Sequence, residues 1–183
     1  MAKIYACIAD GLEEVECLAV VDILRRAGFK VTLASINGSE FVTGSHGITM
    51  KADELWSSDN CGEYDMIFLP GGMLGTLHLG AHKELTAMLK RFKKADDKRL
   101  AAICAAPSVL GENGCLKGLK ATCYPGCEDK LEGAFVTGDK VVTDGDVTTA
   151  RGLGCAIDLG LEIVRIYEGE SVMQKIKDAI QYS

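Results

Sequence analysis

Short apolar runs alternate with longer amphipathic segments along most of the chain. The runs KIYACIA, FKVTLASI, YDMIFLPGG and RLAAIC have the length and aliphatic content of buried strands. Between them, LEEVECLAVVDILRRAG and HKELTAMLKRFKKADD have the pattern of helices, and the first ends at Gly28, a residue typical of the position after a helix. This alternation predicts an α/β fold, with a mostly parallel sheet covered by helices on both faces.

The remaining segments predict shorter elements. EFVTG and GITMK indicate a hairpin around SHG, APSVLGENG a helix, and KATCYP, AFVTG and KVVTDG short strands, before the helices CAIDLGLEIVRIYEG and SVMQKIKDAI. No repeat or linker-like stretch divides the sequence, so we expect one domain over residues 1–183. In such sheets the reactive site lies beyond the carboxyl ends of the strands, where the sequence has Asp10-Gly11, LPGG and AICAA.

Composition narrows the function classes. The formal net charge is −6 and no Lys/Arg block occurs, which argues against nucleic acid or an anionic membrane as a partner. No apolar run approaches the roughly 20 residues that span a bilayer. The N-terminus, MAKIYACIADG, is typical of a first strand and not of a signal peptide, so we expect a cytoplasmic protein. The eight cysteines form no C-x-x-C pair, which favours free thiols and no metal site.

Cys104 stands where an apolar run stops and a proline-led helix begins, in the stretch RLAAICAAPSVL. A residue at such a turn points over the sheet edge, near helix N–H groups that favour an anion. Both features predict a thiol with a lowered pKa, as in a nucleophile elbow, although alanines replace the usual glycines. The alternative is a buried cysteine at the end of a strand.

Glu16 interrupts the apolar face of the first helix, which is formed by Leu12, Ala19, Val20, Ile23 and Ala27. We expect Glu13 and Glu14 to reach solvent at the helix start, whereas Glu16 points into the core. Burial raises the pKa of a carboxyl group, and perturbed carboxyl groups are enriched at active sites. The alternative is a face that is partly solvated, on which Glu16 has no special role.

LPGGMLG, residues 69–75, is the third candidate feature. Paired glycines after a strand let the backbone approach a ligand and offer N–H donors, but the pattern is neither a dinucleotide fingerprint nor a Walker motif, so no nucleotide cofactor is indicated. Tyr124, Arg151 and His46 are further polar candidates. Each of them is equally compatible with an ordinary surface or turn position.

ADGLEEVE, LRRAGFKVTLAS, LPGGMLG, AAICAAPSVL and TARGLG occur in this order and together resemble the ThiJ/PfpI superfamily. Within it, they are most similar to the branch of the Parkinson-associated protein DJ-one. The resemblance covers nearly the whole chain. It implies a flavodoxin-like, class I glutamine amidotransferase-like fold with a cysteine elbow, no cofactor, and a homodimer.

The resemblance also implies roles for single residues. Cys104 matches the reactive cysteine, Glu16 the protonated glutamate beside it, and Gly72 and Ala105 the backbone N–H groups that face the substrate oxygen, with Gly71 in the same pocket. Tyr124 replaces a frequent family histidine and His46 an arginine near an anion pocket, while Arg151 lies in a matching motif. Ala105 replaces the histidine of the peptidase branch, so a protease is not expected.

Two classes of function remain open on this sequence. The first is a lactate-forming glyoxalase or a deglycase that acts on methylglyoxal-type 2-oxoaldehydes or their adducts, with Cys104 as nucleophile, Glu16 as proton shuttle and protection against oxidative stress as its purpose. The alternative is a redox sensor or chaperone without turnover, in which Cys104 is oxidised to sulfinate beside Glu16. Both use the same two residues, so the sequence does not separate them.

Overall fold

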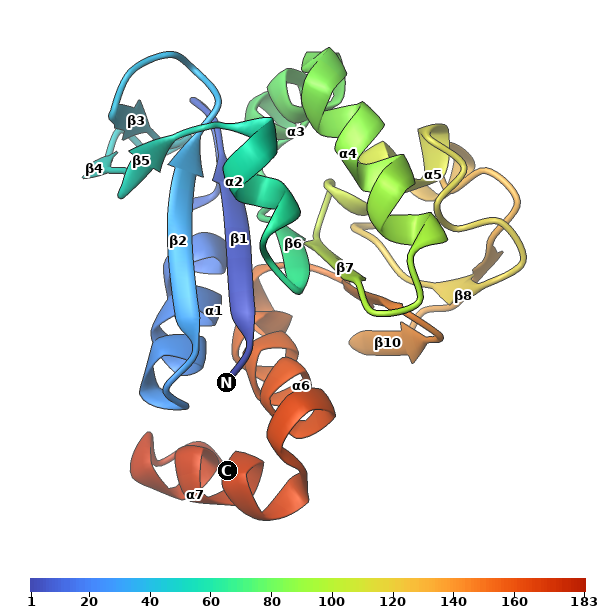
Figure 1. Cartoon of the computed structure of the whole chain (residues 1–183). Coiled ribbons are helices and arrows are strands. Elements are labelled where there is room, and N and C mark those ends of the chain that lie inside the picture. The colour runs from blue at the N-terminus through green and yellow to red at the C-terminus, as the bar shows by residue number, and fades with distance from the viewer.

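The computed structural model describes all residues, 1–183. Its centre is a sheet of seven strands in the order β10-β11-β7-β6-β1-β2-β5 (Figure 1). The strands of this sheet are β1 (Lys3–Ile8), β2 (Lys30–Ser35), β5 (Glu54–Leu55), β6 (Met66–Leu69), β7 (Arg99–Ile103), β10 (Val141–Asp144) and β11 (Val147–Ala150). All neighbouring strands run parallel except β10 and β11. The predicted α/β fold with a mostly parallel sheet is confirmed.

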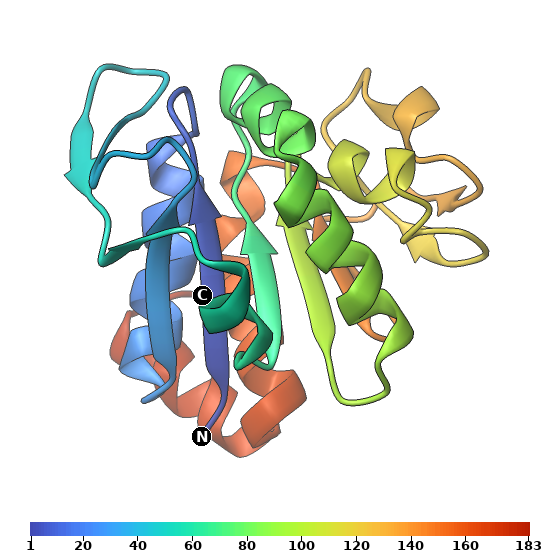
Figure 2. The same ribbon diagram turned by 45° about the horizontal axis from the view of Figure 1, so that its top comes forward.

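Helices cover both faces of the sheet (Figure 2). One layer contains α1 (Glu14–Arg26), α6 (Ala156–Glu168) and α7 (Glu170–Ala179), and the other contains α2 (Ser58–Gly62), α3 (Met73–Ala81), α4 (Lys83–Lys94) and α5 (Pro107–Glu112). Successive strand residues face opposite layers: Ile4 and Ile8 pack with α1 and α6, and Tyr5 and Cys7 with the other layer. Each buried aliphatic side chain stabilises the fold by about 1.5–3 kcal/mol.

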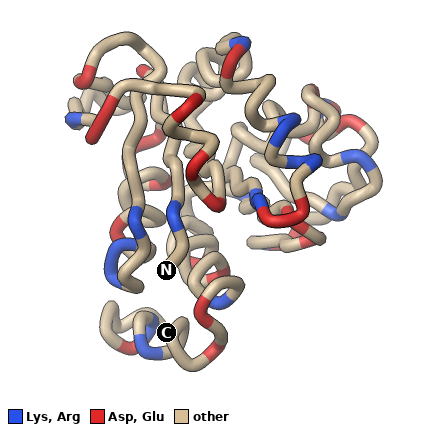
Figure 3. The backbone as a smooth tube through the Cα atoms, viewed as in Figure 1, with Lys and Arg blue, Asp and Glu red and all other residues tan.

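Smaller elements lie at the ends of the sheet. The hairpin of β3 (Phe41–Thr43) and β4 (Thr49–Lys51) is antiparallel, as the sequence predicts. The strands β8 (Lys120–Ala121) and β9 (Phe135–Val136) form a separate parallel pair. Two 3₁₀ turns, η1 (Glu128–Lys130) and η2 (Leu153–Cys155), complete the fold. Lysines and arginines are interspersed with acidic residues over helices and loops (Figure 3), and no helix has the length and apolar content needed to cross a membrane.

Several elements are missing from the sequence-based prediction: β5, α2, α3 and β11. The strand β11 escapes detection because its two central residues, Thr148 and Thr149, are polar although they are fully buried. The helix α3 contains Gly75, which lowers its apparent helix propensity. That glycine is needed, because a Cβ there would lie 2.7 Å from the backbone nitrogen of Leu12. The close approach brings α3 against the start of α1.

The carboxyl ends of β1, β6 and β7 meet at one edge of the sheet. From β1 the chain proceeds outward to β2 on one side, and later returns to β6 on the other, so the strand order reverses between β1 and β6. Open α/β sheets bind their ligands at such a reversal. The loop after β1 leads into α1, the loop after β6 into α3, and the loop after β7 into α5. The three sequence motifs therefore lie on adjoining loops.

Candidate active site

Cys104 occupies a strained turn between β7 and α5. Its φ angle of 64° lies in the left-handed region, which residues other than glycine seldom adopt. The turn is held in place because Cys104 N–H donates to Ala150 O at 2.9 Å and Cys104 O accepts from Tyr124 N–H at 2.7 Å. Cys104 is partly buried, whereas the other seven free cysteines are buried. The strand-to-helix elbow predicted from the sequence is thus present.

Glu16 reaches Cys104 from the neighbouring helix α1. It is 1% exposed, as its position on the apolar face predicts. Its carboxylate accepts a hydrogen bond from Gly71 N–H at 3.1 Å and another from the Cys104 thiol. A Cβ at Gly71 would overlap both the Glu16 carboxylate and the Cys104 side chain. Glycine at position 71 therefore allows the carboxyl group and the thiol to meet.

The two groups shift each other's ionisation. Burial raises the pKa of Glu16 to about 7, against the lowering effect of its hydrogen bond to the thiol. Burial, the nearby Glu16 charge and the hydrogen bond to it raise the pKa of Cys104 to about 12. The raised pKa of Glu16 agrees with the sequence-based prediction. The predicted lowering of the Cys104 pKa is wrong, because burial and the adjacent carboxylate outweigh the nearby N–H groups.

Two backbone N–H groups, those of Gly72 and Ala105, hydrogen-bond the Cys104 sulfur and act in the opposite direction on its pKa. Gly72 has a φ angle of 91°, and a Cβ there would lie 2.5 Å from the backbone nitrogen of Glu13. Only glycine fits this position without displacing the start of α1. The sulfur is therefore surrounded by one carboxyl group and two backbone donors, which is the arrangement that a nucleophile and a developing oxyanion need.

The other predicted pocket residues lie at different places around this centre. Tyr124 is 51% exposed, and its ring lies 3.5 Å from the position of a Cβ on Gly152. Its backbone, not its hydroxyl group, is bonded to Cys104. Arg151 follows the strand residue that accepts the Cys104 N–H, but its side chain is exposed and contacts Gly138 O at 3.4 Å.

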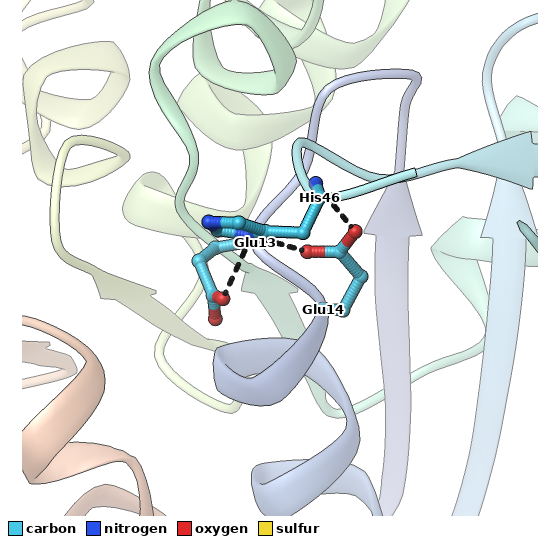
Figure 4. Close-up of side chains that lie close together, drawn as sticks. All are labelled: Glu13, Glu14 and His46. Carbon is cyan, nitrogen blue, oxygen red and sulfur yellow. Dashed lines mark hydrogen bonds and ion pairs between the residues drawn. The ribbon is translucent and has the colours of Figure 1, made fainter. Parts of the chain in front are cut away.

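His46 belongs to a second cluster, at the tip of the β3–β4 hairpin (Figure 4). Its N–H donates to Glu14 Oε1 at 2.8 Å, and its Nδ1 lies 3.1 Å from Glu14 Oε2. Ile48 N–H also reaches Oε1, at 3.4 Å. Burial raises the pKa of Glu14, but hydrogen bonds from its own backbone, from His46 and from Ile48 outweigh this effect and lower the pKa to about 2.

The expectation that Glu13 and Glu14 reach solvent is wrong. They are 9% and 2% exposed, because the hairpin folds over the start of α1. Glu13 caps the helix by accepting Glu16 N–H at 2.7 Å. With His46, these glutamates bring three potential metal-ligand atoms within 4.8 Å of one another. Since both oxygens of Glu14 already accept hydrogen bonds, the cluster is accounted for as the anchor of the hairpin.

Comparison with known proteins agrees with this architecture. Residues 2–166 match the model of the DJ-1/PfpI family. The chain is 35% identical to protein dj-1beta of Drosophila melanogaster over 92% of this chain and 91% of that protein. It is 32% identical to a deglycase of Pyrococcus horikoshii, over 81% and 89% of the two chains. The structure of oxidized DJ-1 from Toxoplasma gondii superposes with a TM-score of 0.95 at 35% identity, over 100% of both chains. The chain therefore belongs to the DJ-1/PfpI family.

Proposed function

We propose that the protein is a cofactor-independent glyoxalase or deglycase that acts on 2-oxoaldehydes such as methylglyoxal, or on their adducts. The observation that supports this most is the pair of Glu16 and Cys104: a buried carboxyl group with a pKa near 7 hydrogen-bonded to a thiol in a strained turn. The relative from Pyrococcus horikoshii that is described as a deglycase supports the same class of activity.

The reactive thiolate forms by transfer of the thiol proton to Glu16. Once Glu16 holds that proton, its negative charge no longer opposes ionisation of the sulfur, and its O–H donates to the thiolate. The N–H groups of Gly72 and Ala105 stabilise the same anion. The two groups titrate as a unit, so the part of the Cys104 pKa shift that comes from the Glu16 charge applies only while Glu16 is ionised.

The reaction then moves hydrogen within the substrate. The Cys104 thiolate adds to the aldehyde carbon, and the N–H groups of Gly72 and Ala105 stabilise the oxyanion that forms. Glu16 gives the proton it took from the thiol to this oxyanion, which completes the hemithioacetal and leaves Glu16 as a carboxylate. Glu16 removes the proton from that carbon and returns one to the adjacent carbon, through an enediol, which gives a thioester of the 2-hydroxy acid. Water hydrolyses the thioester to lactate and the free thiol. One carbon is oxidised and its neighbour reduced, so no external oxidant or reductant takes part.

A steady-state assay with methylglyoxal and lactate detection tests this proposal. We expect turnover by the wild type and none by Cys104→Ser. Brief treatment with iodoacetamide at neutral pH, followed by mass spectrometry, should label Cys104 before the seven buried cysteines. A wild-type protein that produces no lactate, or a Cys104→Ser variant that remains active, contradicts the proposal.

The second candidate is a redox sensor without turnover, and the similarity to an oxidized DJ-1 from Toxoplasma gondii favours it. Two equivalents of hydrogen peroxide would convert the Cys104 thiolate to sulfinate with release of two waters, and Glu16 would hydrogen-bond the product. The distinguishing result is a gain of two oxygen atoms on Cys104 at low peroxide in a protein that makes no lactate.

We also propose that the protein assembles as a homodimer through α1 and the β3–β4 hairpin. Exposed apolar side chains gather there: Val15 and Leu18 on α1 are 50% and 42% exposed, and Phe41 and Ile48 on the hairpin are 62% and 56% exposed. The Ile48 backbone is bonded to Glu14, so the two groups adjoin. Exposed apolar side chains that gather on adjoining elements are typical of an interface. Light scattering at micromolar concentration should give the mass of two chains.

A further inference from the structure

Glu13 and Glu16 occupy the two positions of a capping box at the start of α1, the N-cap and the third helical residue. In such a box the cap side chain accepts the N–H of the third residue, and the side chain of the third residue accepts the N–H of the cap. The first half is present, since Glu13 Oε2 accepts Glu16 N–H at 2.7 Å. The second half is open, because Glu13 N–H donates to Gly71 O at 2.9 Å instead.

The backbone of Gly71 occupies the open half of this box. Its carbonyl oxygen accepts Glu13 N–H, and its own N–H donates to Glu16 Oε2 at 3.1 Å. The loop between β6 and α3 is thereby tied to the start of α1 through both backbone groups of one residue. The same loop carries Gly72 N–H, one of the two donors that hydrogen-bond the Cys104 sulfur. The open box therefore directs the Glu16 carboxyl group to Cys104 and fixes the donor loop at the same time.

Glutamate is an unusual residue for the cap itself. Ser, Thr, Asn and Asp are the side chains that N-caps prefer, and most of them are uncharged. Glu13 is 9% exposed, and its second oxygen, Oε1, lies 3.7 Å from His46 Nδ1, beyond hydrogen-bond distance (Figure 4). A short uncharged side chain would cap the helix as well, so capping alone does not account for the charge at this position.

The negative charge of Glu13 acts on Glu16, three residues further along the helix. Residues at this spacing are neighbours, and two carboxylates in a buried setting disfavour each other's ionised form. Burial is the largest cause of the raised pKa of Glu16, and the Glu13 charge raises it further. The other titratable group that acts on Glu16 is Cys104, from the turn between β7 and α5. The elements β2 and α6 also pack against α1 and contribute none.

We infer that Glu13 is a positioning residue for the reaction at Cys104: it caps α1 while Gly71 holds the capping box open, and its negative charge keeps the proton on Glu16. The role in the reaction rests on the proposed function, in which a protonated Glu16 stands beside the thiolate. The effect on the Glu16 proton is independent of turnover.

Glu13→Asp and Glu13→Asn form a matched pair, because both side chains are preferred caps of the same size and they differ in charge. Infrared spectroscopy follows the protonated Glu16 through its carboxyl C=O band, which is assigned by its loss in Glu16→Gln. We expect the titration midpoint of this band in Glu13→Asn to lie at least about half a pH unit below that in Glu13→Asp, which stays near the wild-type value. Glu13→Gln, which keeps the length of the side chain, should behave as Glu13→Asn does, and Glu14→Gln should leave the midpoint in place.

Turnover gives a second measurement. At neutral pH, kcat for methylglyoxal should be about threefold or more lower in Glu13→Asn than in Glu13→Asp, with a similar KM, because fewer molecules hold the proton that Glu16 gives to the oxyanion. Equal midpoints in the two variants, or an equal displacement in Glu14→Gln, would overturn the inference and leave Glu13 as a cap only. Equal kcat values in the two variants would overturn its role in the reaction. If the wild type makes no lactate, the proposed function fails, while the infrared midpoints still decide whether Glu13 controls the Glu16 proton.

Discussion

Glu14 and Glu16 lie two residues apart on α1, are 2% and 1% exposed, and have opposite pKa shifts. Each carboxylate packs against a glycine: a Cβ at Gly44 would overlap Glu14, and a Cβ at Gly71 would overlap Glu16. The pKa of Glu14 is lowered to about 2 and that of Glu16 is raised to about 7. Their exposed fractions are nearly the same, but Glu16 lies deeper among protein atoms: burial outweighs the hydrogen bonds at Glu16, whereas the hydrogen bonds outweigh burial at Glu14.

The two sites also differ in the donors that the surrounding chain supplies. The β3–β4 hairpin gives Glu14 two backbone N–H groups and the His46 imidazole, which stabilise the carboxylate form. Glu16 receives one backbone N–H, from Gly71, and a thiol, which is a weak donor. The first glutamate is therefore a fixed negative charge that holds a loop. The second can gain or lose a proton near neutral pH, which is the property that a general acid–base group requires.

The largest effect expected from this comparison is the loss of turnover in Glu16→Gln. Glutamine keeps a hydrogen-bonding group beside Cys104 but cannot shuttle a proton, so kcat for methylglyoxal should fall by at least about a hundredfold. Removal of the Glu16 charge also lowers the pKa of the thiol, so the pH profile of Cys104 alkylation should move to lower pH. A variant that is both easier to alkylate and inactive separates proton transfer from thiol activation. Normal turnover in Glu16→Gln would remove Glu16 from the mechanism.

The pH dependence of stability gives the next effect. Folding raises the pKa of Glu16 from 4.5 to about 7. The protonated carboxyl group therefore stabilises the fold at pH values below its pKa in the unfolded chain, and this stabilisation is lost as the pH rises through its pKa in the folded chain. The free energy of unfolding of the wild type should therefore fall by up to about 3 kcal/mol as the pH rises from 4.5 to about 7. Glu16→Gln should show a flatter profile over the same range in urea denaturation. An identical slope in wild type and variant would mean that Glu16 ionises normally.

Glu14→Gln should have the opposite effect on the pH dependence of stability. The lowered pKa of Glu14 stabilises the fold above its unfolded pKa, and this stabilisation is lost as pH falls through about 2. The amide also places N–H groups against the donors of the hairpin, so we expect a loss of about 2 kcal/mol at neutral pH. The variant should therefore not show the loss of stability that the wild type shows at acidic pH. Turnover should remain within a few-fold, because Glu14 does not contact the sulfur, and a variant as inactive as Glu16→Gln would contradict this assignment.

The fold, the burial of Glu16 and the turn at Cys104 could be predicted from sequence, because apolar periodicity reports them directly. Glu16 is visible as a polar residue on an apolar helix face, and Cys104 as a thiol at the end of an apolar run. Glu14 could not be identified in this way, because its burial depends on a hairpin that begins 27 residues later at Phe41. The buried strand β11 could not be predicted for a related reason. Thr148 and Thr149 are polar, and they find their hydrogen-bond partners only in the folded protein.

The ionisation of the thiol could not be predicted from a local rule either. A strand-to-helix turn lowers the pKa of a cysteine when nothing else is near, and the sequence shows only that turn. In the folded chain the sulfur is partly buried and Glu16 approaches it from α1, 88 positions earlier in the sequence; burial first, and then the carboxylate, raise the pKa of the thiol instead of lowering it. Long-range contacts between separate motifs decide the charge, and residue spacing along the chain does not report them.

Tyr124→Phe should have a moderate effect on activity. If Glu16 alone performs the acid–base chemistry, the tyrosine hydroxyl group contributes at most one hydrogen bond, and its removal should lower kcat by about tenfold or less. The profile of kcat/KM against pH should rise once and lack a limb that titrates like histidine, and Tyr124→His should be tolerated. Loss of all activity in Tyr124→Phe, with Cys104 still alkylatable, would make the tyrosine a principal catalytic group.

The smallest effect should come from His46→Ala. The imidazole is 69% exposed and is one of several donors to Glu14, since the N–H groups of positions 46 and 48 remain in the variant. We expect a loss of roughly 0.5–1.5 kcal/mol, measured by urea denaturation at neutral pH. The acid-side loss of stability should begin at higher pH, because Glu14 has one donor fewer. His46→Asn, which keeps a short donor side chain, should recover part of the difference, and kcat/KM for methylglyoxal should stay within about twofold in both variants. A large loss of kcat/KM at unchanged stability would instead assign His46 to substrate binding, as the resemblance to an arginine near an anion pocket implies, and the two glutamates would then serve one site instead of two.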